Sequence, residues 1–438
     1  MSFYKVNGSA GHGKTTKLVK DIQSLYNPNS NTQSFIVITP TNKAAAVLNT
    51  RLHAIGLPNL ASTIHSTIYT WRKTDRIKSI KKVPVFNPFK MKFEKDENGK
   101  TLHKDEIEYV WEKAINPGIN GKTIFVDESS MVGSEVWNSL LSLSSDTTII
   151  AYGDEKQLPP IEKYIELEDS LKPYYRFWHN FQEIESLTTL NVNYRQHGDL
   201  KEFVETIESS VFDSRAKYSI PTPLIKGNNY ALPITSFEDN EIAMLIYDAD
   251  MIITPYNKVR TIVNHICRKK MGQIQNVKVT DIPLVGDRII FTSSIKEELG
   301  QGKNRYKKVL IAKNTIANVD RVVDCSLEDN IVVLDVTDEL GFEYKGLILS
   351  LNVINQKGNV LKLPTFNYAY AVTVHSSQGA QWPNVLYLDS FWPGEEASKL
   401  RYVAVTRASK EIRVITGVSN KTESADAQTN PLVRIGLQ

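Results

Sequence analysis

The sequence predicts an α/β protein with two parallel-sheet domains, each interrupted by an insertion. Apolar runs that suit buried strands alternate with helical patterns over residues 1–65, and similar strands recur at 123–152. A second α/β pattern begins near residue 186 and returns at 368–416. The segments between these stretches lack the alternation, so we interpret them as insertions rather than as separate domains.

The first domain has a βαβα order at its start. We expect its elements as strands at 3–6, 34–39, 123–127 and 147–152, with helices at 14–24 and 42–54. In the second domain we expect strands at 250–254, 368–374, 385–389 and 412–416, with helices at 257–270 and 397–405. The expected domain bounds are 1–65 with 111–185, and 186–283 with 364–438.

The two insertions differ in composition. Residues 71–104, within an insertion at 66–110, carry eleven Lys or Arg against four acids, a net charge of +7. Pro84, Pro88 and the Asn98-Gly99 pair argue against a long helix there, so we expect short strands or turns. A basic segment of this kind either contacts DNA or is a solvated flap. Residues 284–363 are short β runs broken by Gly, Asn and Asp, which suit a small barrel.

Composition excludes several protein classes. Of 438 residues, 41% are hydrophobic and 23% charged, and 52 Lys and Arg against 49 Asp and Glu give a net charge of +3. The sequence contains no uncharged apolar run of about 18 residues, so it predicts no membrane span. The two cysteines cannot form a disulfide framework, and the N-terminus lacks the apolar core of a signal peptide. We therefore expect a cytoplasmic protein.

A phosphate-binding loop follows the first expected strand. Gly8-Ser9-Ala10-Gly11-His12-Gly13-Lys14-Thr15 fits the pattern G-x-x-x-x-G-K-[ST] and precedes a helix. Glycines such as Gly8, Gly11 and Gly13 let backbone amides wrap a phosphate, with Thr16 next in the helix. Lys14 can reach the β- and γ-phosphates, and Thr15 can bind Mg²⁺. The alternative is a flexible glycine turn.

Acidic and amide side chains follow the next two expected strands. Asp127 stands where it can bind the Mg²⁺ that Thr15 contacts, and Glu128 can deprotonate a water. Gln157, in Gly153-Asp154-Glu155-Lys156-Gln157, can both donate to a γ-phosphate and accept from water. Solvated strand-end acids and an ordinary turn are the alternatives.

Two arginines stand in segments that suit a nucleotide site. Arg195 lies in Asn193-Tyr194-Arg195-Gln196, and Arg407 in Val403-Ala404-Val405-Thr406-Arg407. An arginine beside the γ-phosphate stabilises the charge of the transition state. Spacing alone leaves open that both are surface arginines.

The order of these motifs resembles superfamily 1 helicases, most of all the superfamily 1B RecD/Dda type and its compact phage-encoded members. Besides the motifs above, the resemblance rests on Thr39-Pro40-Thr41-Asn42-Lys43-Ala44-Ala45, Ser62-Thr63-Ile64-His65-Ser66, Val126-Asp127-Glu128-Ser129-Ser130-Met131 and Val372-Thr373-Val374-His375-Ser376-Ser377-Gln378-Gly379. It covers residues 1 to about 416.

The resemblance implies two RecA-like domains with ATP and Mg²⁺ between them. It assigns to the nucleotide Lys14, Thr15, Asp127, Glu128, Gln157, Arg195, Gly379 and Arg407, and to single-stranded DNA Thr41, Asn42, Thr63, His65, Thr373 and His375. Without it, His65 and His375 are ordinary core or surface histidines. Trp382 either stacks a base or lies in the core.

The resemblance also gives the insertions a meaning. It implies that residues 66–110 carry the wedge that splits a duplex, with Tyr69, Trp71, Phe86 and Phe89 as candidates, and that residues 284–363 form an SH3-like barrel. The loop at 300–308 either touches DNA or is a mobile hairpin tip.

The chain departs from the family in two further respects. No glutamine precedes Gly8 to read adenine, so nucleotides other than ATP are candidates too. His12 stands where the family usually has a small or hydroxyl residue, and we expect its side chain to face solvent.

The resulting expectation is a monomeric, ATP- and Mg²⁺-dependent DNA helicase that translocates on single strands, 5′-to-3′ by resemblance, in replication, recombination or repair. Its expected partners are single-stranded DNA, strand junctions and a single-strand binding or replisome protein. The alternative is a remodeller that strips proteins or anneals strands without unwinding. A small-molecule kinase is disfavoured by Glu128 and by the second α/β domain.

Overall fold

The computed structural model describes residues 2–87, 92–160, 185–213, 219–299, 306–327, 330–351, 363–390, 396–421, 426 and 429–437. The chain divides into two compact units. One comprises Met1–Thr70, Ile115–Val263 and Ala371–Gln438, and the other Trp71–Ala114 and Asn264–Tyr370. Among the described helices, none combines the length and apolarity that a bilayer crossing requires.

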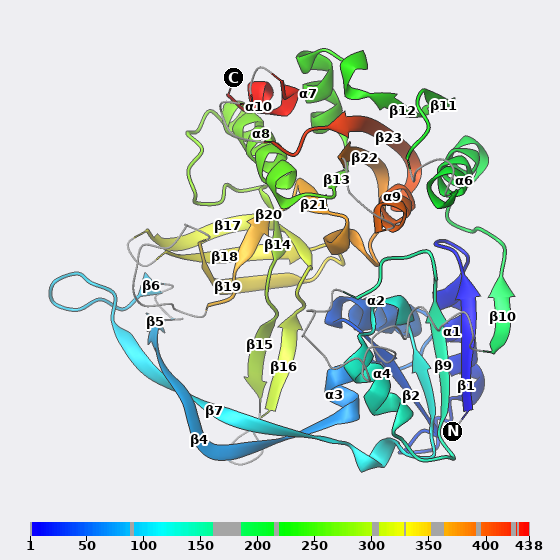
Figure 1. Ribbon diagram of the computed structural model, residues 1–438. Helices are drawn as coiled ribbons and strands as arrows, with labels where there is room; N and C mark the ends of the chain where they lie inside the picture. The colour runs from blue at the N-terminus through cyan, green and yellow to red at the C-terminus, as the bar shows by residue number, and fades with distance from the viewer. Residues whose placement is uncertain are drawn as a thin grey trace, which may run out of the picture. The chain divides into compact units, whose positions relative to one another are not determined.

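The first lobe of the larger unit is built on a six-stranded sheet in which every strand runs parallel to its neighbours (Figure 1). In spatial order its strands are β10 (Ser186–Leu190), β1 (Ser2–Gly8), β9 (Thr148–Gly153), β8 (Thr123–Val126), β2 (Phe35–Thr39) and β3 (Ala61–Thr63). The strands expected at 3–6, 34–39, 123–127 and 147–152 are thereby confirmed.

Both faces of this sheet are buried, since the side chains of successive strand residues pack in two different hydrophobic cores. Val37 packs in the cluster that holds Leu18 and Leu48, whereas its neighbour Ile38 packs with Trp137 on the other face. Helices α1 (Lys14–Leu25) and α2 (Asn42–His53) supply the first core, and α3 (Ile64–Ile68) and α4 (Ser134–Leu141) the second. A parallel sheet covered on both faces explains the apolar runs of the sequence.

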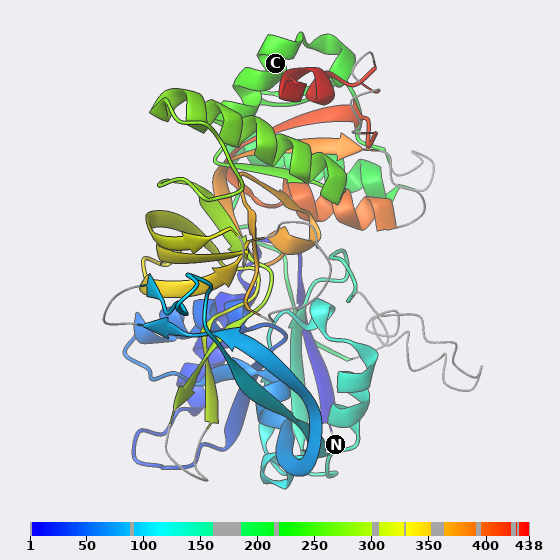
Figure 2. The ribbon, with the colours of Figure 1, turned by 90° about the vertical axis from the view of Figure 1, so that its left-hand side faces the viewer.

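The second lobe repeats this architecture around another six-stranded sheet. Its order is β11 (Leu224–Lys226), β12 (Asn229–Pro233), β23 (Ala408–Val418), β22 (Trp382–Ser390), β13 (Met251–Thr254) and β21 (Ala371–Thr373), all parallel except β11. Figures 1 and 2 show α6 (Gly198–Phe212) and α9 (Glu396–Val405) on one face, with α7 (Asp239–Asp248), α8 (Asn257–Gln275) and α10 (Pro431–Leu437) on the other. Two parallel-sheet lobes fit the expected RecA-like fold.

The smaller unit contains a five-stranded antiparallel sheet. Its order is β19 (Glu343–Ser350), β18 (Ile331–Asp338), β17 (Ile316–Ser326), β14 (Arg288–Phe291) and β20 (Phe366–Tyr368), and β15 (Ile295–Leu299) pairs with β16 (Tyr306–Ile311). Its core comprises residues such as Phe291, Val332, Leu334 and Phe366. The β-rich character expected for 284–363 is confirmed, while the SH3-like barrel stays a prediction.

The basic insertion forms strands longer than expected. β4 (Tyr69–Pro84) and β7 (His103–Ile115) pair as a long ribbon, with β5 (Phe86–Asn87) and β6 (Lys92–Phe93) beyond it (Figure 1). Short strands were the wrong expectation because Pro84 is the final residue of β4, where it ends the strand without breaking it.

One of the four wedge candidates is removed by its surroundings. Tyr69 is only 5% exposed and its hydroxyl lies 2.8 Å from Ser139 Oγ. A side chain packed in the first lobe cannot insert into a duplex. The side chains of Trp71 and Phe86, and Phe89 altogether, lie outside the described residues.

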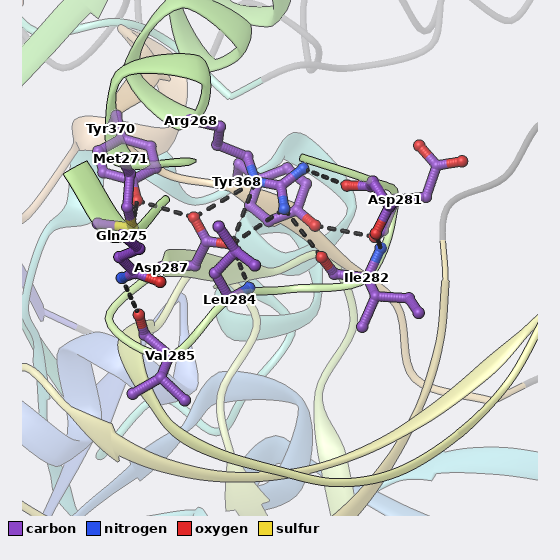
Figure 3. A network of polar contacts seen from close by, with 11 residues as sticks. Arg268, Met271, Gln275, Asp281, Ile282, Leu284, Val285, Asp287, Tyr368 and Tyr370 are labelled. Atoms are coloured by element: carbon purple, nitrogen blue, oxygen red, sulfur yellow. Dashed lines mark hydrogen bonds and ion pairs between the residues drawn. The ribbon is translucent and has the colours of Figure 1, made fainter. Parts of the chain in front are cut away.

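A buried ion pair joins α8 to the antiparallel sheet (Figure 3). Arg268 Nε donates to both Asp287 oxygens at 3.3 and 3.1 Å, and its terminal nitrogens donate to the carbonyls of Thr280 and Ile282. The guanidinium also lies 3.7 Å from the ring centre of Tyr368. Asp287 is 0% exposed and accepts further bonds from the Tyr370 hydroxyl and the Leu284 amide. Every charge in the joint is thus satisfied.

Removing one partner of this joint should destabilise the smaller unit strongly. We expect Asp287→Asn to cost about 3–5 kcal/mol of unfolding free energy, because it leaves the Arg268 guanidinium buried without its counter-ion. Urea unfolding monitored by tryptophan fluorescence measures the loss. The control is Arg321→Ala, which breaks a pair with Asp335 in the same sheet whose arginine is 62% exposed and should cost at most about 1 kcal/mol. Equal losses would contradict the role of burial.

Candidate functional site

Three neighbouring strands of the first lobe position the residues of the site. β1, β9 and β8 lie side by side and parallel, so their carboxyl ends meet at one edge of the sheet. Gly8 ends β1 and opens the glycine loop, Gly153 ends β9, and Asp127 follows the last residue of β8. The loop, the acid pair and the segment carrying Gln157 are therefore neighbours.

The glycine loop is closed on itself by a buried cation. Gly11 and Gly13 have φ of 82° and 79°, the left-handed region that suits glycine, and Lys14 begins α1 directly after them. Lys14 is 9% exposed, and its Nζ donates to the carbonyls of Gly8 and Ser9 at 2.7 and 3.1 Å. Thr15 and Thr16 follow in the first turn of α1. The arrangement leaves amides at a helix N-terminus, which suits a phosphate.

The segment after β10 covers this loop. The Tyr194 amide donates to the Gly11 carbonyl at 2.9 Å, and His12 Nδ1 lies 2.8 Å from the Leu190 carbonyl oxygen. His12 therefore does not simply face solvent, as the sequence suggested, because its imidazole satisfies a strand-end carbonyl. A Cβ placed on Gly11 would lie 2.6 Å from Asn193 Oδ1, so the close approach requires glycine.

The acid pair is electrostatically strained. Asp127 is 4% exposed, and its burial and the charge of Glu128 raise its pKa to about 7, against the opposing effect of Lys14. Glu128 has φ of 46°, unusual for a residue with a side chain. The next hydroxyl, Ser129 Oγ, is buried without a partner among the described residues. A buried carboxylate short of positive charge, two residues before a hydroxyl without a partner, fits a divalent cation.

Gln157 lies inside the site. It is 4% exposed, and the Ser130 hydroxyl donates to its Oε1 at 3.4 Å. The backbone amide of Gln157 donates to the carbonyl of Asp154, which is also buried. The structure thus links the segment after β9 to the residues that follow Glu128.

Both predicted arginines reach the same region. Arg195 Nη1 donates to the Thr406 carbonyl at 2.9 Å, one residue before Arg407. Burial, followed by the charge of Arg407, lowers the pKa of Arg195 to about 10, and Glu128 opposes the shift. Burial also lowers the pKa of Arg407, again opposed by Glu128. The structure therefore groups Glu128 with an arginine from each of two distant segments.

Arg407 is held by backbone oxygens. It is 3% exposed and donates to the carbonyls of Val403 and Ala380 and to the Thr406 hydroxyl. Ala380 follows Gly379, whose φ is 76°. The neighbouring Gln378 Nε2 is buried without a partner among the described residues. Trp382, partly buried, donates its backbone amide to the Arg407 carbonyl.

The predicted DNA residues form two matching turns, one per lobe. β3 ends at Thr63 and β21 at Thr373, and each is followed by x-His-Ser in a short helical turn. Thr63 Oγ1 lies 2.8 Å from Ser66 Oγ, and Thr373 Oγ1 lies 3.1 Å from Ser376 Oγ. His65 is exposed, whereas burial lowers the pKa of His375, which is partly buried.

Thr41 and Asn42 stand beside the first of these turns. Thr39 pairs with Thr63 across β2 and β3, so both strand ends lie at the same edge. Thr41 caps α2 by accepting the Ala44 amide at 3.1 Å, and Asn42 is the first residue of that helix. Thr41, Asn42, Thr63 and His65 are therefore neighbours.

Two tyrosines escaped the sequence assignment. Tyr194 is 68% exposed, and its ring lies 3.3 Å from a Cβ placed on Gly13, so it stands at the mouth of the glycine loop. Tyr402 is fully buried, and its hydroxyl accepts the Ala10 amide. The position of Tyr194 directly before Arg195 could have indicated its place in the site. No neighbouring residue in the sequence indicates the role of Tyr402.

Comparisons with known protein families agree with this geometry. Residues 1–163 match an AAA domain, and residues 368–415 match the UvrD-like helicase C-terminal domain. These two matches support a superfamily 1 helicase. They fall on the glycine loop and on the segment of Gly379 and Arg407.

Relatives of the whole chain are distant. It is 24% identical over 94% of its length to the uncharacterized protein MJ1519 of Methanocaldococcus jannaschii, spanning 36% of that relative. It is 22% identical over 93% of its length to the RecBCD enzyme subunit RecD of Buchnera aphidicola, covering 69% of that protein. The chain therefore spans about a third of the archaeal relative.

Solved structures of Pif1 helicases cover most of the chain at low similarity. Pif1 from Bacteroides bound to ssDNA has 16% identity and a TM-score of 0.45, covering 98% of this chain and 92% of that chain. Pif1 helicase from Candida albicans has 16% identity and a TM-score of 0.48, covering 94% and 90%. These values are too low to bear on function.

The crowding at Gly11 makes a prediction about nucleotide binding. Gly11→Ala should weaken ATP binding at least tenfold, since its Cβ would displace Asn193 and Arg195 at 2.6 and 2.7 Å. Titration with a fluorescent nucleotide measures the affinity. The control is Gly56→Ala, whose φ of 79° is equally positive but which has no atom within 4 Å of the added Cβ. The prediction is wrong if the two variants bind ATP equally well.

Proposed function

We propose that this protein is an ATP- and Mg²⁺-dependent helicase that translocates along single-stranded DNA. The observation that carries the proposal is the meeting of the two lobes at the glycine loop, where Arg195 Nη1 donates to the Thr406 carbonyl beside Arg407 and the Tyr402 hydroxyl accepts the Ala10 amide. A site built from both lobes can change shape with the state of its nucleotide. Hydrolysis is then coupled to movement, which a small-molecule kinase does not need.

The side chains divide the work of hydrolysis. Lys14 and the amides of Gly11 and Gly13 hold the β- and γ-phosphates. Glu128 orients a water and takes its proton, and Gln157 fixes that water against the γ-phosphate. Arg195 and Arg407 balance the charge that develops on the transferred oxygens. Thr15 and Asp127 are the residues that would bind Mg²⁺, which neutralises phosphate charge when present.

The nucleotide base is held by stacking. Tyr194 presents an exposed ring at the loop. A ring face accepts any purine, so base selectivity is weak. Gly379 forms the turn that brings the Ala380 carbonyl to Arg407.

DNA is gripped by the two Thr-x-His-Ser turns. Thr63 and Thr373 each end the outer strand of a sheet, and a histidine, His65 or His375, follows two residues later. Their hydroxyls and imidazoles, with Thr41 and Asn42, suit hydrogen bonds to the phosphate backbone, which carries no sequence information. One turn per lobe allows alternate gripping as the lobes move.

The finer properties follow the resemblance to superfamily 1B. We propose 5′-to-3′ movement, a monomeric enzyme with the domain bounds given above, and strand separation at junctions by the basic insertion. Exposed Arg76, Lys78 and Lys82 on β4 suit a DNA-facing ribbon. A single-strand binding or replisome protein is the proposed partner.

A strand-displacement assay tests the proposal. The protein should separate 5′-tailed duplexes with ATP and Mg²⁺, and 3′-tailed or blunt duplexes at least tenfold more slowly. Lys14→Ala should abolish both hydrolysis and separation. DNA-stimulated hydrolysis without separation of either duplex would instead favour a remodeller that strips proteins or anneals strands.

A matched variant isolates the chemical step. Glu128→Gln keeps the size of the side chain but cannot take a proton, so nucleotide and DNA affinities should stay within about threefold while kcat falls at least 100-fold. Equilibrium binding and single-turnover hydrolysis separate these effects. Unchanged hydrolysis would remove Glu128 from its assigned role.

Backbone gripping makes a prediction about salt. If about five phosphates are neutralised, the log–log slope of affinity against salt concentration should be near −3.5 for single strands. Fluorescence anisotropy with a labelled oligonucleotide measures it from 50 to 300 mM salt. A duplex of the same sequence without a tail is the control, and a flat response for the single strand would count against the proposed grip.

A further inference from the structure

Tyr402 makes two short hydrogen bonds that connect three segments of the site. Its hydroxyl accepts the amide of Ala10, in the glycine loop, at 2.8 Å and donates to Asp154 Oδ2 at 2.8 Å. Ala10, Asp154 and Tyr402 are 6%, 2% and 0% exposed. Tyr402 lies on α9 in the second lobe, whereas both partners belong to the first.

The chemistry of the three groups fixes the direction of this chain of bonds. An amide can only donate and a carboxylate can only accept, so the hydroxyl must accept from one and donate to the other. Burial, with the nearby charges of Asp154 and Glu208, raises the pKa of Tyr402 well above its ordinary value. The hydroxyl therefore keeps the proton that it gives to Asp154.

The ends of this chain reach the residues assigned to hydrolysis. Asp154 accepts the Lys156 amide on its other oxygen, and its carbonyl accepts the Gln157 amide. In the other direction, Tyr402 precedes Arg407 by five residues, and the Arg407 amide donates to the Ala404 carbonyl at the end of α9. A shift of Tyr402 therefore moves the helix end that carries Arg407.

The ring of Tyr402 is packed independently of its hydroxyl. It makes an edge contact with Phe212 of α6, with ring centres 5.8 Å apart. A phenylalanine can fill the same volume, so the hydroxyl can be removed while the packing of α6 on α9 is kept.

We propose that Tyr402 is a positioning residue for ATP hydrolysis, which holds Arg407 in register with the glycine loop and Gln157. The proposal rests on the proposed function of the site and adds a residue that touches neither substrate nor metal. Since Arg407 acts on charge that develops only in the transition state, its displacement lowers kcat and leaves ground-state binding intact.

The test is Tyr402→Phe, assayed for ATP hydrolysis with and without single-stranded DNA. We expect kcat to fall roughly 10- to 100-fold, as for other displacements of about 1 Å, while KM for ATP stays within threefold. Asp154→Ala removes the acceptor at the other end of the same chain and serves if Tyr402→Phe fails to fold. The double variant should be no slower than the slower single variant, because both remove one linkage.

Tyr387→Phe is the matched control. Tyr387 is also fully buried and its hydroxyl donates to a buried carboxylate, Asp389 Oδ1, at 2.9 Å. Asp389 also pairs with Arg401 of α9, so this variant disturbs the same helix without touching the bonds of Tyr402 to Ala10 and Asp154. It should lower the melting temperature as Tyr402→Phe does and keep kcat. Equal kcat losses in the two variants, or a kcat for Tyr402→Phe within threefold of wild type, would overturn the proposal.

Failure of the proposed function gives a different result. If wild type hydrolyses ATP without any response to DNA, the helicase proposal fails, while the DNA-free kcat values still decide the role of Tyr402.

Discussion

The backbone polar groups of the glycine loop are the constraint around which this molecule is organised. The loop does not form regular structure, so its buried amides and carbonyls need side-chain or distant backbone partners. Lys14 Nζ donates to the carbonyls of Gly8 and Ser9, and the Tyr194 amide after β10 donates to the Gly11 carbonyl. The Tyr402 hydroxyl accepts the amide of Ala10. The elements that satisfy the loop are those that carry the assigned residues, so loop geometry and site geometry are one property.

Charge is handled in opposite ways in the two units. In the joint of the smaller unit, Arg268 and Asp287 neutralise each other and every remaining hydrogen-bonding group has a partner. In the site, burial raises the pKa of Asp127 and lowers that of Arg195, so these charges are held at a cost. Such a site is completed by a charged ligand. The overall charge of +3 does not indicate this local imbalance of charge.

The sequence predicts the α/β framework because its strands are buried on both faces. The runs at Phe35–Thr39 and Thr123–Val126 are apolar apart from one threonine each, and the glycine loop stands between a strand and a helix as expected. The length of β4 was not predictable in this way, since its sequence is rich in charged residues and has no apolar run. Distances such as that between Tyr402 and Ala10 depend on how two lobes fold together, and no spacing encodes them.

Each insertion leaves and re-enters its lobe at adjacent points. The Asn116 amide after β7 donates to the Ile68 carbonyl before β4, and Phe291 of β14 pairs with Phe366 of β20. Closing such a loop costs little more entropy as it grows, since the cost rises only with the logarithm of its length. The lobes can therefore fold without waiting for their insertions. The size and contents of a segment attached in this way can therefore vary while the two lobes keep their register.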